Sequence, residues 1–257
     1  MLKSLDLTGR VAVVIGGTSG IGRTLALGLA DAGADVIATG RRENLVQEVA
    51  AEIEAKGKKS LSVAVDVLNR ASVDALRDAV MKHFGRADIL LNAAGKIGRK
   101  PTVTFPEQEW DETFNVNVTG ALRACQAFYE PLKASGHGRI INIVSLNSYV
   151  SLREVAAYAA SKSALLALTR SLAVEWSSEG INVNAIAPGV FRTDLNKNLL
   201  DSTDRGKELL MRTPMKRFGQ TGELNGAAVL LASDAASFIT GQCIVVDGGF
   251  LASGVNS

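Results

Sequence analysis

The chain has 257 residues, 47% of them hydrophobic and 21% charged, and its formal net charge is +2. This nearly balanced charge gives no indication of a nucleic acid or another polyanion as partner. The chain contains no stretch of about 18 apolar residues, the length that a membrane helix needs. Its first residues hold no apolar core of a signal peptide. Cys125 and Cys243 are not spaced as metal ligands or as a redox pair. We therefore expect a cytoplasmic globular protein with reduced cysteines and no catalytic metal.

Apolar runs and helical patterns alternate along the whole chain. Strands are predicted at 10–15, 35–39, 60–65, 88–92, 139–144, 181–186 and 243–246. Helices are predicted at 21–32, 43–56, 70–84, 107–134, 155–179 and 223–232. Apolar strands that alternate with helices indicate an α/β fold, a doubly wound Rossmann sheet of about seven parallel strands with helices on both faces. Residues 190–222 interrupt the alternation, and a segment of that length is typical of a lid or binding loop.

The first predicted strand ends in a glycine-rich turn. It reads Gly16-Gly17-Thr18-Ser19-Gly20-Ile21-Gly22 and leads into the first predicted helix. Glycines allow the backbone to approach phosphate groups closely, and a helix N-terminus supplies N–H donors and a positive dipole. The absence of a following Gly-Lys-Ser/Thr excludes a P-loop. The pattern predicts a dinucleotide site, with an ordinary glycine-rich turn as the alternative.

The second predicted strand ends at Thr39 and is followed by Gly40-Arg41-Arg42. A site that prefers NAD usually has a carboxylate here, which bonds the ribose 2′-hydroxyl. Gly40 stands at that place, and Arg41 could bind a 2′-phosphate through its forked donors. Arg42 is the weaker candidate, because it begins a helix and could be solvated. The sequence therefore favours NADP(H) and leaves NAD(H) possible.

Tyr158 and Lys162 are four residues apart in the helix predicted at 155–179. This spacing places a phenol and an ammonium one turn apart on the same helix face. A nearby cation lowers the pKa of a tyrosine, which is otherwise about 10. The pair is thus a candidate general acid/base. A half-buried tyrosine beside a surface lysine is the commoner outcome of this spacing alone.

The glycine turn and this pair together resemble the classical short-chain dehydrogenase/reductase family, from Leu7 to about Gly249. Further family motifs follow in the family's order: Asn92-Ala93-Ala94-Gly95, Asn117, Ser145, Pro188-Gly189 with Thr193, and Asp247-Gly248-Gly249. Two residues depart from the family's pattern. Ile15 stands where a threonine is usual, and Ala93 replaces the second asparagine of Asn-Asn-Ala-Gly.

The resemblance implies one Rossmann domain over residues 1–257, with a cofactor half at about 1–145 and a catalytic and substrate half at about 146–257. Residues 190–222 would be its lid-like segment, and the assembly would be a homotetramer. The implied reaction is hydride transfer between a nicotinamide cofactor and a secondary alcohol or ketone.

The implied catalytic residues are Asn117, Ser145, Tyr158 and Lys162. Tyr158 would be the acid/base, Lys162 would tune it and bond the nicotinamide ribose, Ser145 would donate to the substrate oxygen, and Asn117 would hold a relay water. The implied cofactor contacts are Gly16, Thr18, Ser19, Gly20, Ile21, Gly22, Arg41, Asp66, Val67, Asn92, Ala93, Ala94, Gly95, Tyr158, Lys162, Pro188, Gly189 and Thr193. Asp66 has an alternative role, capping of the helix that begins near Asn69.

Two segments, 105–110 and 212–219, resemble gluconate 5-dehydrogenases and related sugar-acid dehydrogenases. A sugar acid requires a cation for its carboxylate, and the candidate cations are Lys96, Arg99, Arg153 and Arg192. A neutral polyol is the other expected kind of substrate. Two alternatives remain: a 3-oxoacyl-carrier-protein reductase, for which Arg123 could contribute a basic patch, and a non-catalytic cofactor-binding regulator.

Overall fold

The computed structural model describes residues 3–193, 200–201 and 203–254. Within them, six parallel strands form one sheet, β1 (Val11–Ile15), β2 (Asp35–Thr39), β3 (Ile89–Asn92), β4 (Gly138–Ile143), β5 (Ile181–Pro188) and β6 (Cys243–Val246). Their order is β2-β1-β3-β4-β5-β6. The chain runs outward from β1 to β2 and then crosses back to β3 on the other side of β1. In doubly wound sheets, ligands bind at the carboxyl ends of the strands beside such a switch point.

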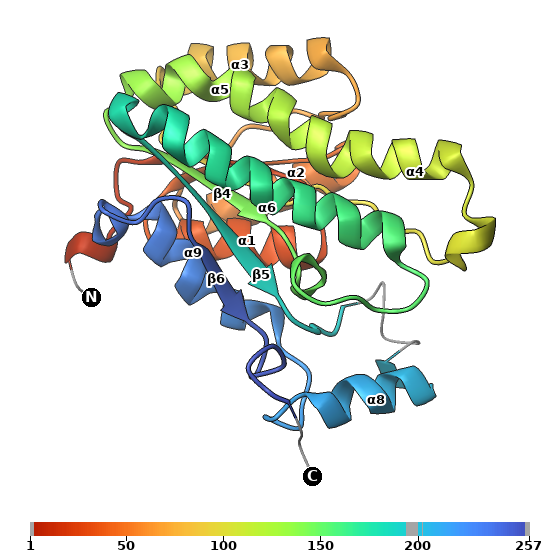
Figure 1. The fold of residues 1–257 in the computed structure, drawn as a ribbon. Coiled ribbons are helices and arrows are strands. Elements are labelled where there is room, and N and C mark those ends of the chain that lie inside the picture. The colour runs from red at the N-terminus through yellow and green to blue at the C-terminus, as the bar shows by residue number, and fades with distance from the viewer. Residues whose placement is uncertain (1–2, 194–199, 202, 255–257) are drawn as a thin grey trace.

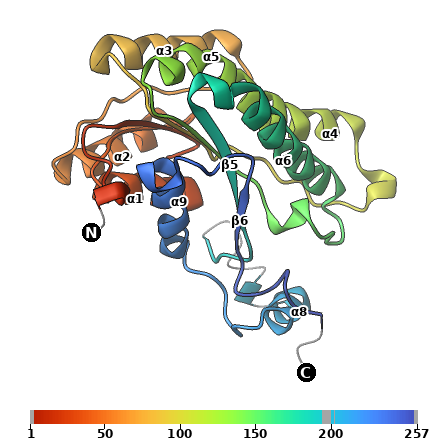
Figure 2. The same ribbon diagram turned by 60° about the vertical axis from the view of Figure 1, so that its left-hand side comes forward.

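Alternate residues of the strands face two layers of helices, as Figures 1 and 2 show. Ala12 and Val14 pack with α1 (Gly20–Asp31), α2 (Glu43–Ala55) and α9 (Asn225–Ala232). Val13 and Ile15 pack with the opposite layer, which contains α3 (Arg70–Phe84), α5 (Gly120–Ala134) and α6 (Ala156–Trp176). This period-2 division buries both faces of the sheet, as the continuous apolar strands predict.

The helix predicted at 107–134 is interrupted. It consists of α4 (Glu107–Phe114), a π-helical turn η3 (Asn115–Thr119) and α5. Such turns insert a residue into a helix and are frequent at functional sites. The helix predicted at 155–179 ends in a 3₁₀ turn, η5 (Ser177–Glu179), and the one predicted at 223–232 begins in another, η6 (Thr221–Leu224). The other 3₁₀ turns are η1 (Lys3–Leu5), η2 (Thr102–Thr104), η4 (Leu146–Ser148) and η7 (Asp234–Ala236).

The strand predicted at 60–65 does not form, so the described sheet has six strands rather than about seven. This segment runs beside β2, where backbone hydrogen bonds join Val65 N to Gly40 O at 2.9 Å and Val36 N to Lys59 O at 3.1 Å. Between them, the hydroxyls of Ser60 and Thr39 donate to backbone carbonyls across the two segments. Side-chain hydrogen bonds thus replace some of the backbone hydrogen bonds of the strand pairing that the apolar pattern predicts.

A buried polar chain aligns α6 with the centre of the sheet. Asn92 Nδ2 donates to Asn142 Oδ1 at 2.9 Å, and Asn142 Nδ2 donates to Thr169 Oγ1 at 3.0 Å. Buried polar groups are costly unless they are paired, so these contacts favour one register of α6 on β3 and β4. Tyr158 and Lys162 lie on the same helix, toward its amino end.

The long segment 190–222 contains α8 (Asp204–Arg212), which stands beyond the carboxyl ends of β5 and β6, apart from both helical layers (Figures 1 and 2). Leu209 of α8 packs with Leu146, Leu200 and Phe250 in a small separate apolar cluster. None of the helices described is both long and apolar enough to span a membrane.

Candidate active site

A cavity of about 600 Å³ lies at the carboxyl ends of the strands. Many of the residues predicted to act in catalysis or cofactor binding line it: Ser19, Gly20, Ile21, Ala93, Gly95, Ser145, Tyr158, Lys162, Pro188, Gly189 and Thr193. They come from the ends of three strands, β3, β4 and β5, and the beginnings of two helices, α1 and α6. The structure therefore brings motifs from both halves of the chain to one crevice.

The glycine turn is packed backbone to backbone on the end of β3. A Cβ on Gly16 would lie 2.5 Å from Ala94 N, and one on Gly22 would lie 2.1 Å from Gly16 O. Gly16 also has a φ of 82°, in the left-handed region. Gly16, Gly22 and Ala94 thus shape the wall of the crevice through their close packing.

The amino end of α1 opens on this crevice. Ser19 is its N-cap residue but makes no side-chain capping hydrogen bond. Among the described residues, a Cβ on Gly20 would have Thr193 Cγ2 as its nearest neighbour, at 4.0 Å, so none of them fills the space in front of the helix. Free N–H groups and the helix dipole at such an end fit a phosphate group. The residues present are therefore suited to hold the pyrophosphate of a dinucleotide.

At the end of β2, a side chain in place of Gly40 would require the Thr18 side chain to shift. A Cβ on Gly40 would lie 2.8 Å from Thr18 Oγ1. Arg41 is exposed, whereas Arg42 Nη2 donates to Ser19 Oγ at 3.4 Å. Arg42, which the sequence analysis ranked below Arg41, is thus the arginine in contact with the glycine turn.

Asp66 and Val67 lie just before α3. Asn69, not Asp66, caps α3, because its Oδ1 accepts from Ala71 N at 2.9 Å. Asp66 Oδ1 instead accepts from Leu68 N at 3.0 Å. The alternative that Asp66 caps this helix is therefore wrong. The Asp66 side chain closes a local turn instead.

Lys162 is almost completely buried, with 4% of its surface exposed. Its Nζ donates to Ile143 O, at the end of β4, at 2.7 Å, and lies 5.8 Å from the centroid of the Tyr158 ring. Burial lowers the pKa of Lys162 from 10.5 to about 8, because a desolvated ammonium loses hydration. The ammonium is thus held in place and can release its proton only a little above neutral pH.

Tyr158 is half-buried beside Ser145. Burial raises the pKa of Tyr158, and a hydrogen bond with Ser145 lowers it by a smaller amount. The predicted lowering of this pKa by Lys162 is therefore wrong for the protein alone, because loss of water around the phenol dominates. Ser145 itself is 7% exposed and its Oγ accepts from Asn147 N at 3.1 Å, which fixes it at the start of η4.

Asn117 is buried in the π-helical turn. Its Oδ1 accepts from Lys96 N at 2.7 Å, and its Nδ2 donates to Lys96 O at 2.9 Å and to Ser161 Oγ at 2.9 Å. A Cβ on Gly95 would lie 3.6 Å from both Asn117 Oδ1 and Lys162 Nζ. Asn117 therefore ties the loop after β3 to α6 and lies against the same backbone as the ammonium.

Asn92 lies below the crevice rather than on it. It is 4% exposed, its Nδ2 bonds Asn142, and its Oδ1 has no hydrogen-bond partner in the described structure. Val67 is also buried, and its carbonyl accepts from Arg123 Nη1 at 3.0 Å. Both residues are predicted cofactor contacts, and they keep 4% and 8% of their surface exposed, respectively.

The four candidate cations differ in their surroundings. Lys96 and Arg99 line the cavity, but Lys96 is paired with Glu112. Arg192 is paired with Asp201, and the Arg153 side chain is exposed. Of the two candidate cations that line the cavity, Arg99 is thus the one for which no ion pair forms among the described residues.

Sequence reasoning missed part of the cavity wall. The missed residues are apolar: Ile97, Val144, Leu146, Leu152, Val190, Phe191, Leu200 and Leu209. The helical spacing of Arg205, Leu209 and Arg212 was a usable signal for α8, since apolar and basic residues recur on one face. The packing of that face against Leu146 and Phe250 could not be read from spacing.

Comparisons with known proteins place the chain among relatives of one family. A family model described as Enoyl-(Acyl carrier protein) reductase matches residues 15–251. The chain is 39% identical over 255 residues to a 2-dehydro-3-deoxy-D-gluconate 5-dehydrogenase of Dickeya dadantii (strain 3937), which covers 98% of this chain and 99% of the relative. It is 37% identical over 248 residues to a gluconate 5-dehydrogenase of Gluconobacter oxydans (strain 621H), with 96% and 97% covered.

A solved structure is similar over nearly the whole chain. It is a gluconate 5-dehydrogenase from Burkholderia cenocepacia J2315 in complex with NADP and tartrate, 39% identical in sequence, with a TM-score of 0.94. The match covers 98% of this chain and 99% of that one. A likeness of this extent includes every segment that lines the cavity.

Replacing Lys162 by methionine is expected to stabilise the cofactor-free protein. The fall of the Lys162 pKa to about 8 corresponds to roughly 3 kcal/mol of cost to the folded state at pH 7. The variant also loses the hydrogen bond to Ile143 O, which destabilises it by about 1 kcal/mol and offsets part of that gain. We expect a net gain of about 1–2 kcal/mol in the free energy of unfolding, measured by urea denaturation at pH 7.

The gain should depend on pH with a definite sign. Between pH 8 and 10.5 the unfolded chain binds a proton that the folded protein has released, so wild-type stability rises with pH there. The advantage of Lys162→Met should shrink across this window. A variant that is less stable than wild type at pH 7, or a gain that grows toward pH 10, would contradict the account.

Proposed function

The chain belongs to the short-chain dehydrogenase/reductase family, and we propose that it interconverts a sugar acid and its keto acid with NADP(H). It is an oxidoreductase that acts on CH–OH donors. The observation that carries the proposal is the cavity in which Ser145, Tyr158 and Lys162 meet the open amino end of α1. A neutral polyol is the alternative substrate.

The cofactor, when bound, supplies or accepts the hydride. Tyr158 gives a proton to the substrate oxygen in reduction and takes one in oxidation. The Ser145 hydroxyl donates to the same oxygen as negative charge develops on it. Lys162, desolvated and fixed on Ile143 O, stabilises the phenolate that Tyr158 forms. Asn117 holds the loop after β3 and a water that links Lys162 to solvent.

The proposed cofactor site uses the residues predicted from the sequence. The glycine turn and the amino end of α1 hold the pyrophosphate, Asp66 and Val67 border the adenine, and Pro188, Gly189 and Thr193 border the nicotinamide. Arg41 and Arg42 hold the 2′-phosphate. The absence of a carboxylate at Gly40 supports NADP(H), as do three similar structures that contain NADP. Residues 1–145 would then form the cofactor half and 146–257 the catalytic and substrate half.

Arg99 is the proposed cation for the substrate carboxylate, since it lines the cavity with Ser145 and Tyr158. The named activities of the gluconate dehydrogenase relatives support an acid substrate. A carrier-protein substrate has less support. Arg123, the residue considered for a basic docking patch, is turned inward and donates to Val67 O and to Asn115 Oδ1 at 2.8 Å.

The proposed assembly is a homotetramer. Large apolar side chains are exposed on the side of α6 and β6: Val174 is 80% exposed, Phe238 is 102% exposed and Val245 is 38% exposed. β6 is an edge strand of the sheet, and an exposed apolar edge is usually covered in solution. A second copy of the chain is the proposed cover.

Replacing Tyr158 by phenylalanine tests whether the site is catalytic. The change removes the proton carrier and keeps the ring, so kcat/KM with gluconate should fall by about 10³-fold. The cofactor Kd, followed by NADPH fluorescence, should change less than about threefold. Tyr149→Phe is the matched control, because Tyr149 does not line this cavity. Unchanged turnover in Tyr158→Phe would favour the non-catalytic regulator.

Replacing Arg41 and Arg42 by alanine tests the cofactor choice. Loss of two cations from the 2′-phosphate should weaken NADPH binding by about tenfold or more while NADH binding changes little. Fluorescence titration with both cofactors measures the ratio. Arg77→Ala serves as the control, since Arg77 pairs with Asp74 and Asp78 on α3. A wild-type protein that binds NADH as tightly as NADPH would refute the NADP(H) preference.

The oligomeric state can be measured by light scattering after size exclusion. We expect a mass four times that of the chain, and a smaller species for Phe238→Asp, because a buried charge is costly in an apolar interface. A monomer of wild-type protein at micromolar concentration would reject the tetramer.

A further inference from the structure

Arg205 is a charged residue on α8 that the proposed reaction does not use. Its Nη2 donates to Arg153 O at 2.9 Å, and its Nη1 lies 3.7 Å from Glu154 Oε2. Only 20% of the Arg205 side chain is exposed. Residues four apart share one face of a helix, and Leu209, one turn further along α8, lines the cavity. Arg205 therefore lies on the face of α8 that is turned toward the site.

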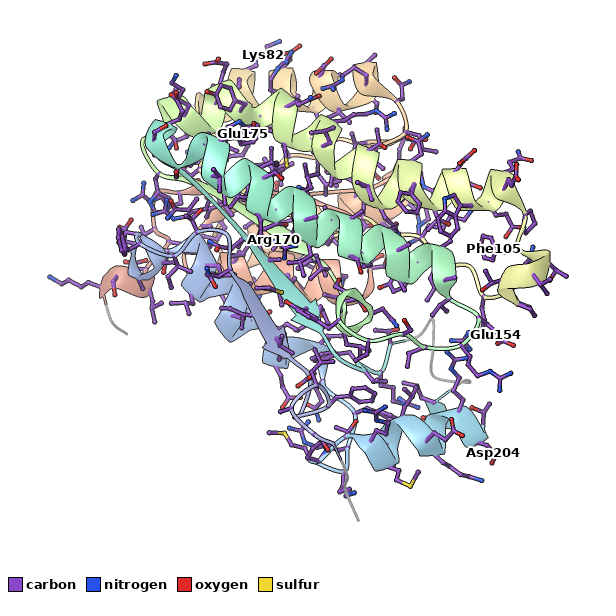
Figure 3. The ribbon with its side chains drawn as sticks, viewed as in Figure 1. Lys82, Phe105, Glu154, Arg170, Glu175 and Asp204 are labelled. Carbon is purple, nitrogen blue, oxygen red and sulfur yellow. The ribbon has the colours of Figure 1, made fainter. Side chains whose placement is uncertain are left out.

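Glu154 connects three segments and lines a second cavity, which shares Asn147 and Leu152 with the first. Its φ is 67°, a left-handed conformation that residues with side chains rarely adopt, and strain of this kind gathers at binding sites. Its carbonyl accepts from Lys100 N at 2.9 Å, while its carboxylate faces Arg205. Figure 3 shows Glu154 in the loop before α6, facing the start of α8, where Asp204 is labelled.

Arg99 belongs to the same group of charges. Burial and the positive charge of Arg205 lower the pKa of Arg99, and the negative charge of Glu154 raises it. Arg99, Arg205 and Glu154 are therefore electrostatic neighbours with one positive charge in excess. Two arginines against one carboxylate make a site that is complementary to a second carboxylate.

We propose that Arg205 is a second carboxylate-binding arginine, which acts with Arg99 to select sugar acids over neutral polyols, and that Glu154 occupies Arg205 until the substrate arrives. This inference rests on the proposed function and concerns the boundary between its cavity, lined by Arg99 and Leu209, and the adjoining one, lined by Glu154. The 3.7 Å contact with Glu154 is too long for a hydrogen bond, so Arg205 retains donors for an incoming carboxylate. The bond to Arg153 O keeps the guanidinium in place when the carboxylate of Glu154 is displaced.

Gluconate and sorbitol provide the first test, because they share a carbon skeleton and differ in the carboxylate. Arg205→Gln should raise KM for gluconate by about tenfold or more and leave kcat and the KM for sorbitol within about twofold. Lys207→Gln is the matched control: Lys207 carries the same charge on the same helix, and its side chain is 80% exposed. Equal loss with both substrates would mean that Arg205 only supports α8, and would overturn the proposal.

Binding of tartrate and threitol, followed by calorimetry with NADP⁺ present, tests Arg205 without turnover. Wild-type protein should bind tartrate more tightly than threitol, Arg205→Gln should lose that preference, and Glu154→Gln should bind tartrate several-fold more tightly. Equal binding of the two ligands by wild type, or weaker tartrate binding by Glu154→Gln, would overturn the proposal. A protein that prefers tartrate but oxidises neither substrate would leave Arg205 as an anion ligand and refute the proposed function instead.

Discussion

The close contact between the glycine turn and the end of β3 is the constraint on which the site depends. Gly16 and Gly22 pack so tightly on each other and on Ala94 that no side chain fits between them. This contact lets α1 begin at the edge of the crevice with its N–H groups open. The Asn92–Asn142–Thr169 chain then extends the alignment from β3 through β4 to α6. The proposed cofactor end and the proposed proton-transfer end of the cavity are therefore positioned by one continuous set of packed backbone and buried amides.

The acid/base pair is built at a cost to stability. Lys162 has one hydrogen bond, to Ile143 O, in place of its hydration shell, and a buried ammonium of this kind destabilises the folded state. Tyr158 is similarly disfavoured as a phenolate by burial, which Ser145 offsets only in part. Only the Lys162 ammonium is shifted toward neutral pH by this burial, whereas the Tyr158 phenol is shifted away from it. The cost of burying both groups explains why they need the rigid support of the sheet beneath them.

Charge placement distinguishes the mouth of the cavity from the rest of the surface. Lys96 and Arg192 have carboxylate partners within the chain, and Arg123 is engaged by backbone and amide oxygens. Arg205 faces the carboxylate of Glu154 at 3.7 Å, and the same carboxylate raises the pKa of Arg99. An excess of positive charge over an apolar cavity suits a small acid better than a neutral polyol. The identity of the residues alone would not separate these cations, since each is an ordinary surface charge in the sequence.

The sequence by itself determined the sheet, the crevice and the reacting groups, because each is encoded by short-range patterns. Apolar runs are the signature of buried parallel strands, and glycines that must lack a side chain cannot be replaced. An i, i+4 pair on a helix fixes its own geometry, as Tyr158 and Lys162 do. The tertiary structure alone decided what depends on partners distant in the chain. Residues 60–65 form no strand, and the hydroxyls of Thr39 and Ser60 instead donate to carbonyls across this segment and β2. Burial reversed the expected shift of the Tyr158 pKa, and Arg205 reached Glu154 only because α8 folds back over the end of the sheet. Solvation and side-chain pairing are set by which surfaces come together, and local sequence does not contain that information.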